Sequence, residues 1–207
     1  MKNCHVILPY MTTQRKIILA STSASRRNLL DRTGIQYSIE PSDYEEDMSI
    51  DLSPHDLVKT FSQGKARAVA KNHDDAIIIG ADSIAVLDGR PLGKPKDRAD
   101  AEKTLRSLSG RDHIFLTGFT IIDSKNGKET TKLIENTVTF RKLSEADITA
   151  YIDSGEPLAG HAGAYAAQGR GAFLISSITG EYTNTLGLPL GSLAETMLEF
   201  GINLLEQ

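Results

Sequence analysis

Apolar runs too short for helices alternate along the chain with segments whose apolar residues recur every three or four positions. The run Ile77-Ile78-Ile79 is continuous and β-branched, which predicts a strand buried on both faces. Helical spacing from Leu57 to Ala70, after Ser53-Pro54, predicts a helix with an N-cap and an N1 proline. In chain order we expect strands at 16–20, 37–40, 76–80, 84–87, 113–123, 129–140 and 173–177, and helices at 26–32, 53–72, 98–108, 145–153 and 188–200.

Turn residues separate several of these elements. Asn126-Gly127, between the two long strands, and Asp88-Gly89 are typical of tight β-turns. The glycine-dense segment 155–171 has a backbone able to wrap around a ligand, although a plain surface loop has the same composition. No repeat or linker-like segment interrupts the chain. We therefore expect a single domain over 15–207 after a frayed N-terminal extension at 1–14.

The composition limits the classes of function and the locations that the chain can have. The 207 residues include 23 Lys and Arg against 27 Asp and Glu, a formal net charge of -4, without the basic excess of nucleic-acid-binding proteins. The one cysteine, Cys4, excludes an intramolecular disulfide, as expected in a reducing compartment. No apolar run approaches the roughly 20 residues of a membrane span. We expect a cytoplasmic protein with no nucleic-acid or membrane partner, and Met11 as an alternative start.

Residues 19–27, LASTSASRR, place hydroxyls and two guanidinium groups where a strand turns into a helix. Helix N-termini present unpaired N–H groups and a partial positive charge, and arginines add donors that match phosphate oxygens. The turn therefore predicts a phosphate site. A plain N-cap with two solvent-facing arginines fits the same residues.

Charged residues elsewhere would suit such an anion. Asp82 follows an apolar strand, where α/β folds place ligands, and Glu45 or Glu46 could complete a carboxylate pair for Mg²⁺. Lys65 on a helix and Lys94 in a constrained loop would suit a polyphosphate. Taken singly, these residues also fit a turn aspartate, a solvated acidic loop and surface lysines.

Other chemistries lack their motifs. The chain has no P-loop, because residues 89–95 have the wrong spacing and a proline after the lysine, and it has no G-x-G-x-x-G. Its histidines have no zinc-site spacing, and no G-x-S-x-G elbow is present. Zinc hydrolases and serine hydrolases are therefore disfavoured.

Seven short blocks, in order over residues 17–200, resemble the Maf family of nucleoside triphosphate pyrophosphatases. They are LASTSxxRR at 19–27, GADS at 80–83, LGKP at 92–95, LSGRDH at 108–113, GEP at 155–157, AGAYxxQG at 162–169 and GLPL at 187–190. Each block is weak alone, but the ordered set is specific.

The resemblance implies an α/β fold of the Maf/inosine triphosphatase-like type, with an elongated, mixed, twisted sheet flanked by helices, two lobes, a central cleft and a homodimer. It also implies hydrolysis of a nucleoside triphosphate to the monophosphate and pyrophosphate, dependent on Mg²⁺ or another divalent metal such as Mn²⁺, as house-cleaning of non-canonical or pyrimidine nucleotides. Matched by position, the implied catalytic residues are Asp82, Glu46, Lys65 and Lys94, the metal ligands are Asp82 and Glu46, and the substrate-binding residues are Ser21, Ser23, Arg26 and Gln168.

The chain departs from the family pattern in three places. The S-x-S-P-R-R turn lacks its proline and first arginine, since Ala24 and Ser25 stand there, which suggests a changed base preference. Ser83 replaces a threonine and keeps the hydroxyl. The D-K-A-G segment is one residue longer here, with His161 near the lysine position.

The resemblance suggests a mechanism in which Mg²⁺ held by Asp82 and Glu46 bridges the triphosphate. One of these carboxylates would activate a water that attacks the α-phosphorus. Lys65, Lys94 and Arg26 would neutralise the leaving pyrophosphate. Two other functions stay open: a nucleotide-binding regulator without turnover, in a family linked to cell-division arrest, and a phosphatase that releases orthophosphate.

Overall fold

The computed structural model describes residues 15–47, 49–158 and 160–206, so the expected N-terminal extension and Met11 lie outside the described residues. Its elements are the strands β1 (Lys16–Leu19), β2 (Ser38–Ile39), β3 (Ala76–Leu87), β4 (Arg90–Leu92), β5 (Asp112–Asp123), β6 (Glu129–Phe140) and β7 (Ile175–Thr179), the α-helices α1 (Ala24–Asp31), α2 (Pro54–Ala70), α3 (Arg98–Leu108), α4 (Glu145–Asp153) and α5 (Leu190–Leu198), and the 3₁₀ helices η1 (Glu156–Leu158), η2 (Ala162–Ala164), η3 (Gly169–Leu174), η4 (Tyr182–Leu186) and η5 (Leu204–Glu206).

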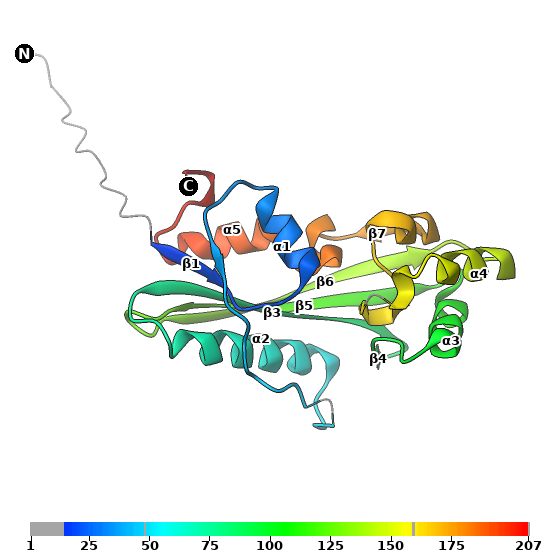
Figure 1. Cartoon of the computed structure of the whole chain (residues 1–207), viewed down its shortest axis with the longest axis horizontal. Helices are drawn as coiled ribbons and strands as arrows, with labels where there is room; N and C mark the ends of the chain where they lie inside the picture. The colour runs from blue at the N-terminus through cyan, green and yellow to red at the C-terminus, as the bar shows by residue number, and fades with distance from the viewer. Residues whose placement is uncertain (1–14, 48, 159, 207) are drawn as a thin grey trace, which may run out of the picture.

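A seven-stranded mixed sheet forms the centre of the molecule. Its strand order is β2-β1-β3-β5-β6-β7, with β4 paired to β3. The pairs β2–β1 and β1–β3 are parallel, whereas the pairs β3–β4, β3–β5, β5–β6 and β6–β7 are antiparallel. Figure 1 shows that the three long strands β3, β5 and β6 extend along the length of the molecule, with helices on both faces. The expected elongated mixed sheet flanked by helices is confirmed.

Most expected elements are present, with small differences at their ends. α3, α4 and β6 have the predicted bounds, and β5 and β6 form the predicted hairpin. α1 begins at Ala24, two residues earlier than expected, because Ser23 is its N-cap. The last strand begins at Ile175 rather than at Phe173, which belongs to η3. Among the residues that the structure describes, no helix is both long and apolar enough to cross a membrane.

The two strands expected on either side of Asp82 are a single strand, β3, so that part of the prediction was wrong. Asp82 pairs with Gly118 of β5, and this antiparallel ladder continues through the polar positions without a break. Along the other edge of β3, the pairing with β1 ends at Ile79 and the pairing with β4 begins at Ala85. Asp82 therefore lies within a strand, where that edge lacks a strand neighbour between residues 80 and 84.

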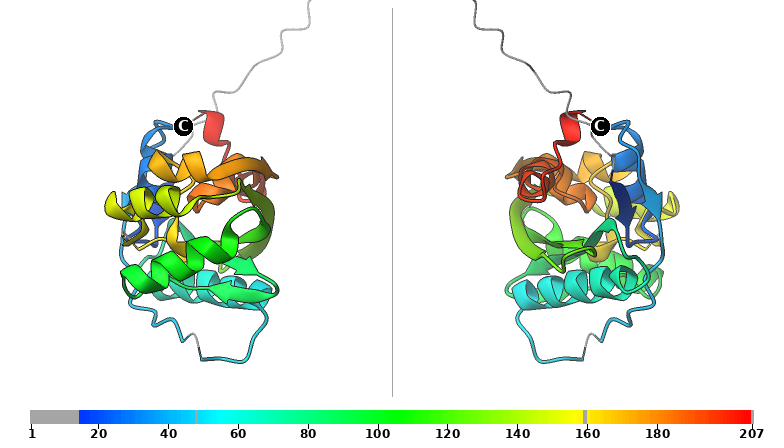
Figure 2. Two further views of the ribbon diagram at one scale, coloured as in Figure 1. Left: turned by 90° about the vertical axis from the view of Figure 1, so that its right-hand side faces the viewer. Right: turned by 90° about the vertical axis from the view of Figure 1, so that its left-hand side faces the viewer.

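The sheet separates two apolar layers. α2 lies on one face of the sheet, and α1 and α5 lie on the other (Figures 1 and 2). Side chains of β3 alternate between these layers: Ile77 and Ile79 join the large core with α1 and α5, while Ile78 packs with Ala66 and Val69 of α2. All three isoleucines are fully buried, which confirms a strand buried on both faces.

Two glycines of the sheet let α2 approach closely. A Cβ at Gly80 would lie 2.4 Å from the carbonyl oxygen of Ser62, and one at Gly118 would lie 2.4 Å from that of Val58. Both distances are far below van der Waals contact, so any side chain at these positions would push the helix outward. The backbone of α2 thus rests directly on β3 and β5.

A buried aromatic cluster fills the core where β5 and β6 pass the segment between η2 and η3. The rings of His113, Phe140 and Tyr165 pack edge to face, with centroids 4.9 to 5.3 Å apart. Nε2 of His113 is 2.8 Å from the hydroxyl oxygen of Tyr165, and its Nδ1 has no partner among the described residues. Burial lowers the pKa of His113 to about 4, so this imidazole is neutral near pH 7.

The neutral His113 should make the fold sensitive to acid. Its folded-state pKa lies below the 6.5 of the unfolded chain, so the unfolded state binds the extra proton and stability is lost as pH falls from about 6.5 towards 4. Between pH 7 and pH 5 we expect this residue to remove about 2 kcal/mol of unfolding free energy. His113→Gln keeps a polar atom near the Nε2 position without titrating, so urea unfolding should give a smaller loss over this range. An equal loss of stability in the variant would show that His113 is not the cause of the acid sensitivity.

Candidate active site

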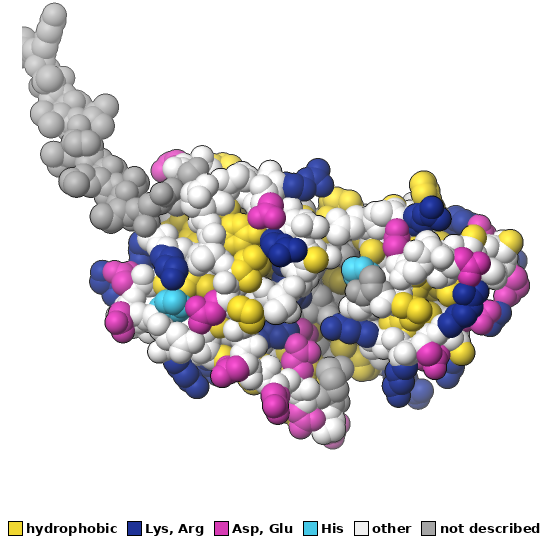
Figure 3. Space-filling view, in the orientation of Figure 1, with side chains coloured by type: hydrophobic (Ala, Val, Ile, Leu, Met, Phe, Trp, Pro, Cys, Tyr) yellow, Lys and Arg dark blue, Asp and Glu magenta, His cyan; other side chains and the backbone are white. Residues whose placement is uncertain are grey.

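A cavity of about 740 Å³ lies where β3 lacks a strand neighbour. One wall comes from the β1–α1 turn and α2, and the other from the β4–α3 loop and the segment around η2. In the space-filling view, basic and acidic side chains lie side by side around a hollow between the two ends of the molecule (Figure 3). The expected central cleft is present. It is lined by all eight residues expected at the site: Ser21, Ser23, Arg26, Glu46, Lys65, Asp82, Lys94 and Gln168.

The serine-rich turn is built around the start of α1. Ser23 is the N-cap of this helix, and its hydroxyl accepts from the backbone N–H of Arg26 at 3.4 Å. The hydroxyl of Ser21 accepts from the N–H of Ser23 at 3.2 Å. Arg26 is buried whereas Arg27 is exposed. The alternative of solvent-facing arginines therefore holds for Arg27 only.

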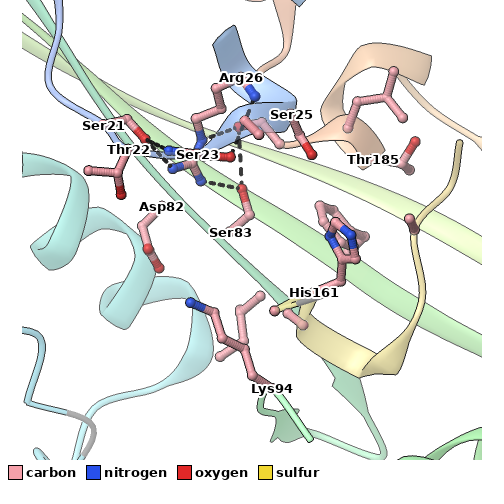
Figure 4. Close-up of a pocket in the computed structure, with 18 of the residues that line it drawn as sticks. Ser21, Thr22, Ser23, Ser25, Arg26, Asp82, Ser83, Lys94, His161 and Thr185 are labelled. Atoms are coloured by element: carbon pink, nitrogen blue, oxygen red, sulfur yellow. Dashed lines mark hydrogen bonds between the residues drawn. The ribbon is translucent and has the colours of Figure 1, made fainter. Parts of the chain in front are cut away.

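The guanidinium of Arg26 joins three segments at the edge of the cavity (Figure 4). Nε donates to the carbonyl oxygen of Gly187 at 2.7 Å, Nη1 to the hydroxyl of Ser21 at 3.2 Å, and Nη2 to the hydroxyl of Ser83 at 3.0 Å. Burial lowers the pKa of Arg26, and the charges of Asp82 and Glu46 oppose that shift. The side chain thus brings a positive charge into the cavity and holds the strand, the turn and η4 in register.

Lys65 of α2 lies between two carboxylates. Its Nζ is 2.6 Å from Oε1 of Glu46 and 2.7 Å from Oδ1 of Asp82. The side chains of Lys65 and Asp82 are 13% and 14% exposed, whereas that of Glu46, on the loop between β2 and α2, is 41% exposed. Glu45, the other acidic candidate, is exposed and does not line the cavity. The structure therefore selects Glu46 from the two.

Asp82 is mostly buried beside the ammonium of Lys65. Burial raises the pKa of this carboxyl group above its usual range, and the neighbouring charges of Lys65 and Arg26 only partly offset that effect. A carboxylate held in this way has a high affinity for protons and cations. Such a group suits general base chemistry and metal binding.

Lys94, His161 and Gln168 lie on the wall that faces the serine-rich turn. In Figure 4 the ammonium of Lys94 points across the cavity towards Asp82, and His161 also lies at its edge. The N–H of Gly163 donates to the carbonyl oxygen of Gly93 at 3.1 Å, which joins η2 to the loop that carries Lys94. Burial lowers the pKa of His161, the residue near the lysine position of the family pattern, which favours its neutral form.

Three residues that build the site were not among the site residues expected from the sequence. Ser83 binds Arg26 and lies 2.9 Å from the hydroxyl of Thr117, and Gly187 supplies a carbonyl acceptor to Arg26. Tyr44 also lines the cavity, from an acidic loop without periodicity. The GADS and GLPL blocks pointed to Ser83 and Gly187, whereas no signal in the sequence pointed to Tyr44.

The carboxylates present fit a hard divalent cation. No group of three or more His, Cys, Asp or Glu side chains able to hold a metal is present among residues 15–47, 49–158 and 160–206. Glu46 and Asp82 nevertheless converge on one positive charge, the ammonium of Lys65. Mg²⁺ commonly uses one or two carboxylates together with substrate phosphates and water, so this pair is sufficient.

Comparison with known proteins identifies the family of the chain. The family model described as Maf-like protein matches residues 16–200. The chain belongs to the Maf-like family. The resemblance drawn from the seven sequence blocks is thereby confirmed.

Curated relatives match this Maf-like chain over almost their full length. A protein of Syntrophus aciditrophicus (strain SB) is 41% identical over 186 residues, which cover 90% of each chain. One of Moorella thermoacetica is 43% identical over 188 residues, covering 91% of this chain and 96% of its own. Both relatives are named dTTP/UTP pyrophosphatase.

Solved structures show a more distant likeness to this Maf-like chain. A nucleoside-triphosphatase / dITP/XTP pyrophosphatase from Mycobacterium abscessus is 19% identical with a TM-score of 0.41, over 62% of this chain and 75% of its own. The Ham1 protein of Staphylococcus aureus is 16% identical with a TM-score of 0.44, over 61% and 72%. These likenesses are partial.

Proposed function

We propose that this Maf-like protein is a nucleoside triphosphate pyrophosphatase, which hydrolyses its substrate to the monophosphate and pyrophosphate. The observation that carries the proposal is the convergence of Lys65, Glu46 and Asp82 in one cavity with the serine-rich turn. The names of the curated relatives, at about two-fifths identity over nine-tenths of each chain, support the same reaction. Opposite charges at short range in a partly closed cavity suit the polyanionic tail of a nucleotide.

The residues divide the work of the reaction. Asp82 or Glu46 takes a proton from water, whose oxygen forms a bond to the α-phosphorus while the bond from that phosphorus to the bridging oxygen breaks. Pyrophosphate leaves with the electron pair of that bond. Arg26, Lys65 and Lys94 stabilise the charge that develops on the leaving oxygens, which is the main contribution of a protein to such transfers.

We propose that Glu46 and Asp82 also hold Mg²⁺. Such an ion supplies additional positive charge to the phosphate oxygens when it is bound. A homodimer and a cytoplasmic location stay predictions from the sequence.

A panel of nucleoside triphosphates tests the activity directly. With Mg²⁺ present, dTTP and UTP should be converted to monophosphate and pyrophosphate faster than the purine nucleotides, as the names of the relatives suggest. Ser25 lines the cavity at the position where the family pattern has an arginine. If the preferred base differs from that of the relatives, we expect this substitution to be the cause.

The identity of the released anion separates this function from its alternatives. Orthophosphate in place of pyrophosphate would indicate a phosphatase. Tight binding of an unchanged triphosphate would indicate a nucleotide-binding regulator.

A further inference from the structure

Gly64 lies in the middle of α2, at a position where alanine is normally preferred. Its backbone is not in the left-handed region, so conformational freedom does not explain the glycine. The space of the missing side chain is filled by a tyrosine ring. A Cβ at Gly64 would lie 2.3 Å from Cε2 and 2.4 Å from Cζ of Tyr44. The helix and the ring therefore meet at a distance that only glycine permits.

This contact lies next to the proposed catalytic pair. Tyr44 precedes Glu46 by two residues, and Gly64 immediately precedes Lys65. The ring of Tyr44 also packs against Phe61, with centroids 6.2 Å apart and planes inclined by 55°. The ring thus packs against one turn of α2, from Phe61 to Gly64, directly beside the lysine that binds Glu46.

The loop between β2 and α2 has few other attachments near this point. At its start the carboxylate of Glu40 is 2.7 Å from Nε2 of His73. Between this pair and Glu46, Pro41, Asp43 and Glu45 are exposed, whereas the ring of Tyr44 is half-buried. An ion pair with an exposed partner contributes little to order, because solvent screens it and the side chains lose entropy. The burial of an aromatic ring is the stronger attachment.

We propose that the Tyr44–Gly64 contact is a lock that positions Glu46 over Lys65 and Asp82. Tyr44 and Gly64 are thus positioning residues for the activity proposed above, on which this inference rests. The lock explains why α2 retains a glycine in its interior. It also explains how an exposed, acidic loop delivers one carboxylate to a defined place.

Gly64→Ala tests the lock, because the new methyl group must displace the ring while it favours the helix. We expect kcat/KM for pyrophosphate release to fall about 10²-fold, as small displacements of positioned groups do. The half-saturating Mg²⁺ concentration should rise, and the melting temperature should stay the same or increase. In metal-free and nucleotide-free protein, the amides of residues 42–47 should exchange hydrogen about tenfold faster than in the wild type.

Further variants separate the lock from damage to the helix. Tyr44→Ala should cause the same losses, and Gly64→Ala added to it should cause no further loss, since the space is then free. Tyr44→Phe keeps the ring and should keep the slow exchange. Arg67→Ala, on an exposed part of the same helix, where the side chain binds Glu129, should leave activity unchanged.

The outcomes are distinct. Normal exchange in Gly64→Ala, additive losses in the double variant, or fast exchange with full activity would each overturn the lock. A wild-type protein that releases no pyrophosphate would refute the proposed function instead. The exchange measurements on the metal-free protein would still test the contact itself.

Discussion

Asp82→Asn is expected to reduce pyrophosphate release about 10³-fold, the range observed when a general base or a charged group at a transition state is lost. The amide cannot accept the proton of the attacking water, and it is a weaker ligand for a cation. Asp82 lies within β3, with Lys65 at 2.7 Å, so the substitution removes the charge without moving the backbone. The measurement is kcat/KM with a saturating divalent metal.

The same variant should fold normally. Burial raises the pKa of Asp82, which means that the buried charge is unfavourable and that a neutral amide of the same size is tolerated. We expect an unchanged or higher melting temperature. Asp88→Asn, at the exposed turn after the same strand, is the matched control and should retain full activity. Near wild-type turnover in Asp82→Asn would show that this carboxylate is not needed for the reaction.

Arg26→Ala is expected to have the second-largest effect, on both activity and stability. Loss of its charge from the cavity should lower kcat/KM on the order of 10²-fold. The carbonyl oxygen of Gly187 and the hydroxyls of Ser21 and Ser83 would lose their shared donor. Because buried acceptors without a partner are unfavourable, we expect a loss of about 3 kcal/mol of unfolding free energy.

Two further variants test this double role of Arg26. Arg26→Lys keeps the charge but cannot reach three acceptors in one plane, so it should recover part of the activity and little of the stability. Arg27→Ala removes the adjacent, exposed guanidinium and should change neither quantity measurably. Equal effects of Arg26→Ala and Arg27→Ala would mean that the turn binds anions through its general charge and not through the buried residue.

The local pattern of apolar and polar residues was sufficient to predict much of the fold. Strand periodicity with Asn126-Gly127 between the strands predicted the β5–β6 hairpin, and helical spacing predicted α3, because both signals are contained within a few residues of the chain. The sequence predicted two strands in place of β3, because Asp82 and Ser83 interrupt the apolar run. Their strand conformation comes from pairing with β5, a contact between residues far apart in sequence.

Some residues of the candidate site could likewise be predicted from the sequence, whereas others depend on tertiary contacts. Asp82 and Lys94 lie in the ordered blocks, and the resemblance that these blocks carry implied Lys65 as a third active-site residue, matched by its position along the chain. Spacing alone could not choose between Glu45 and Glu46, because both lie in an exposed acidic loop without periodicity. The choice depends on Tyr44 and α2, which fix the loop through tertiary contacts.

The close approach of α2 to the backbone of Gly80 affects the geometry of the active site. Gly80 touches α2 at the residue after Lys65, and Asp82 follows it by two positions along β3. The distance between α2 and the sheet at this point therefore influences how closely the ammonium of Lys65 approaches the carboxylate of Asp82. A side chain at Gly80 would therefore displace α2 and, with it, the lysine that contacts Asp82.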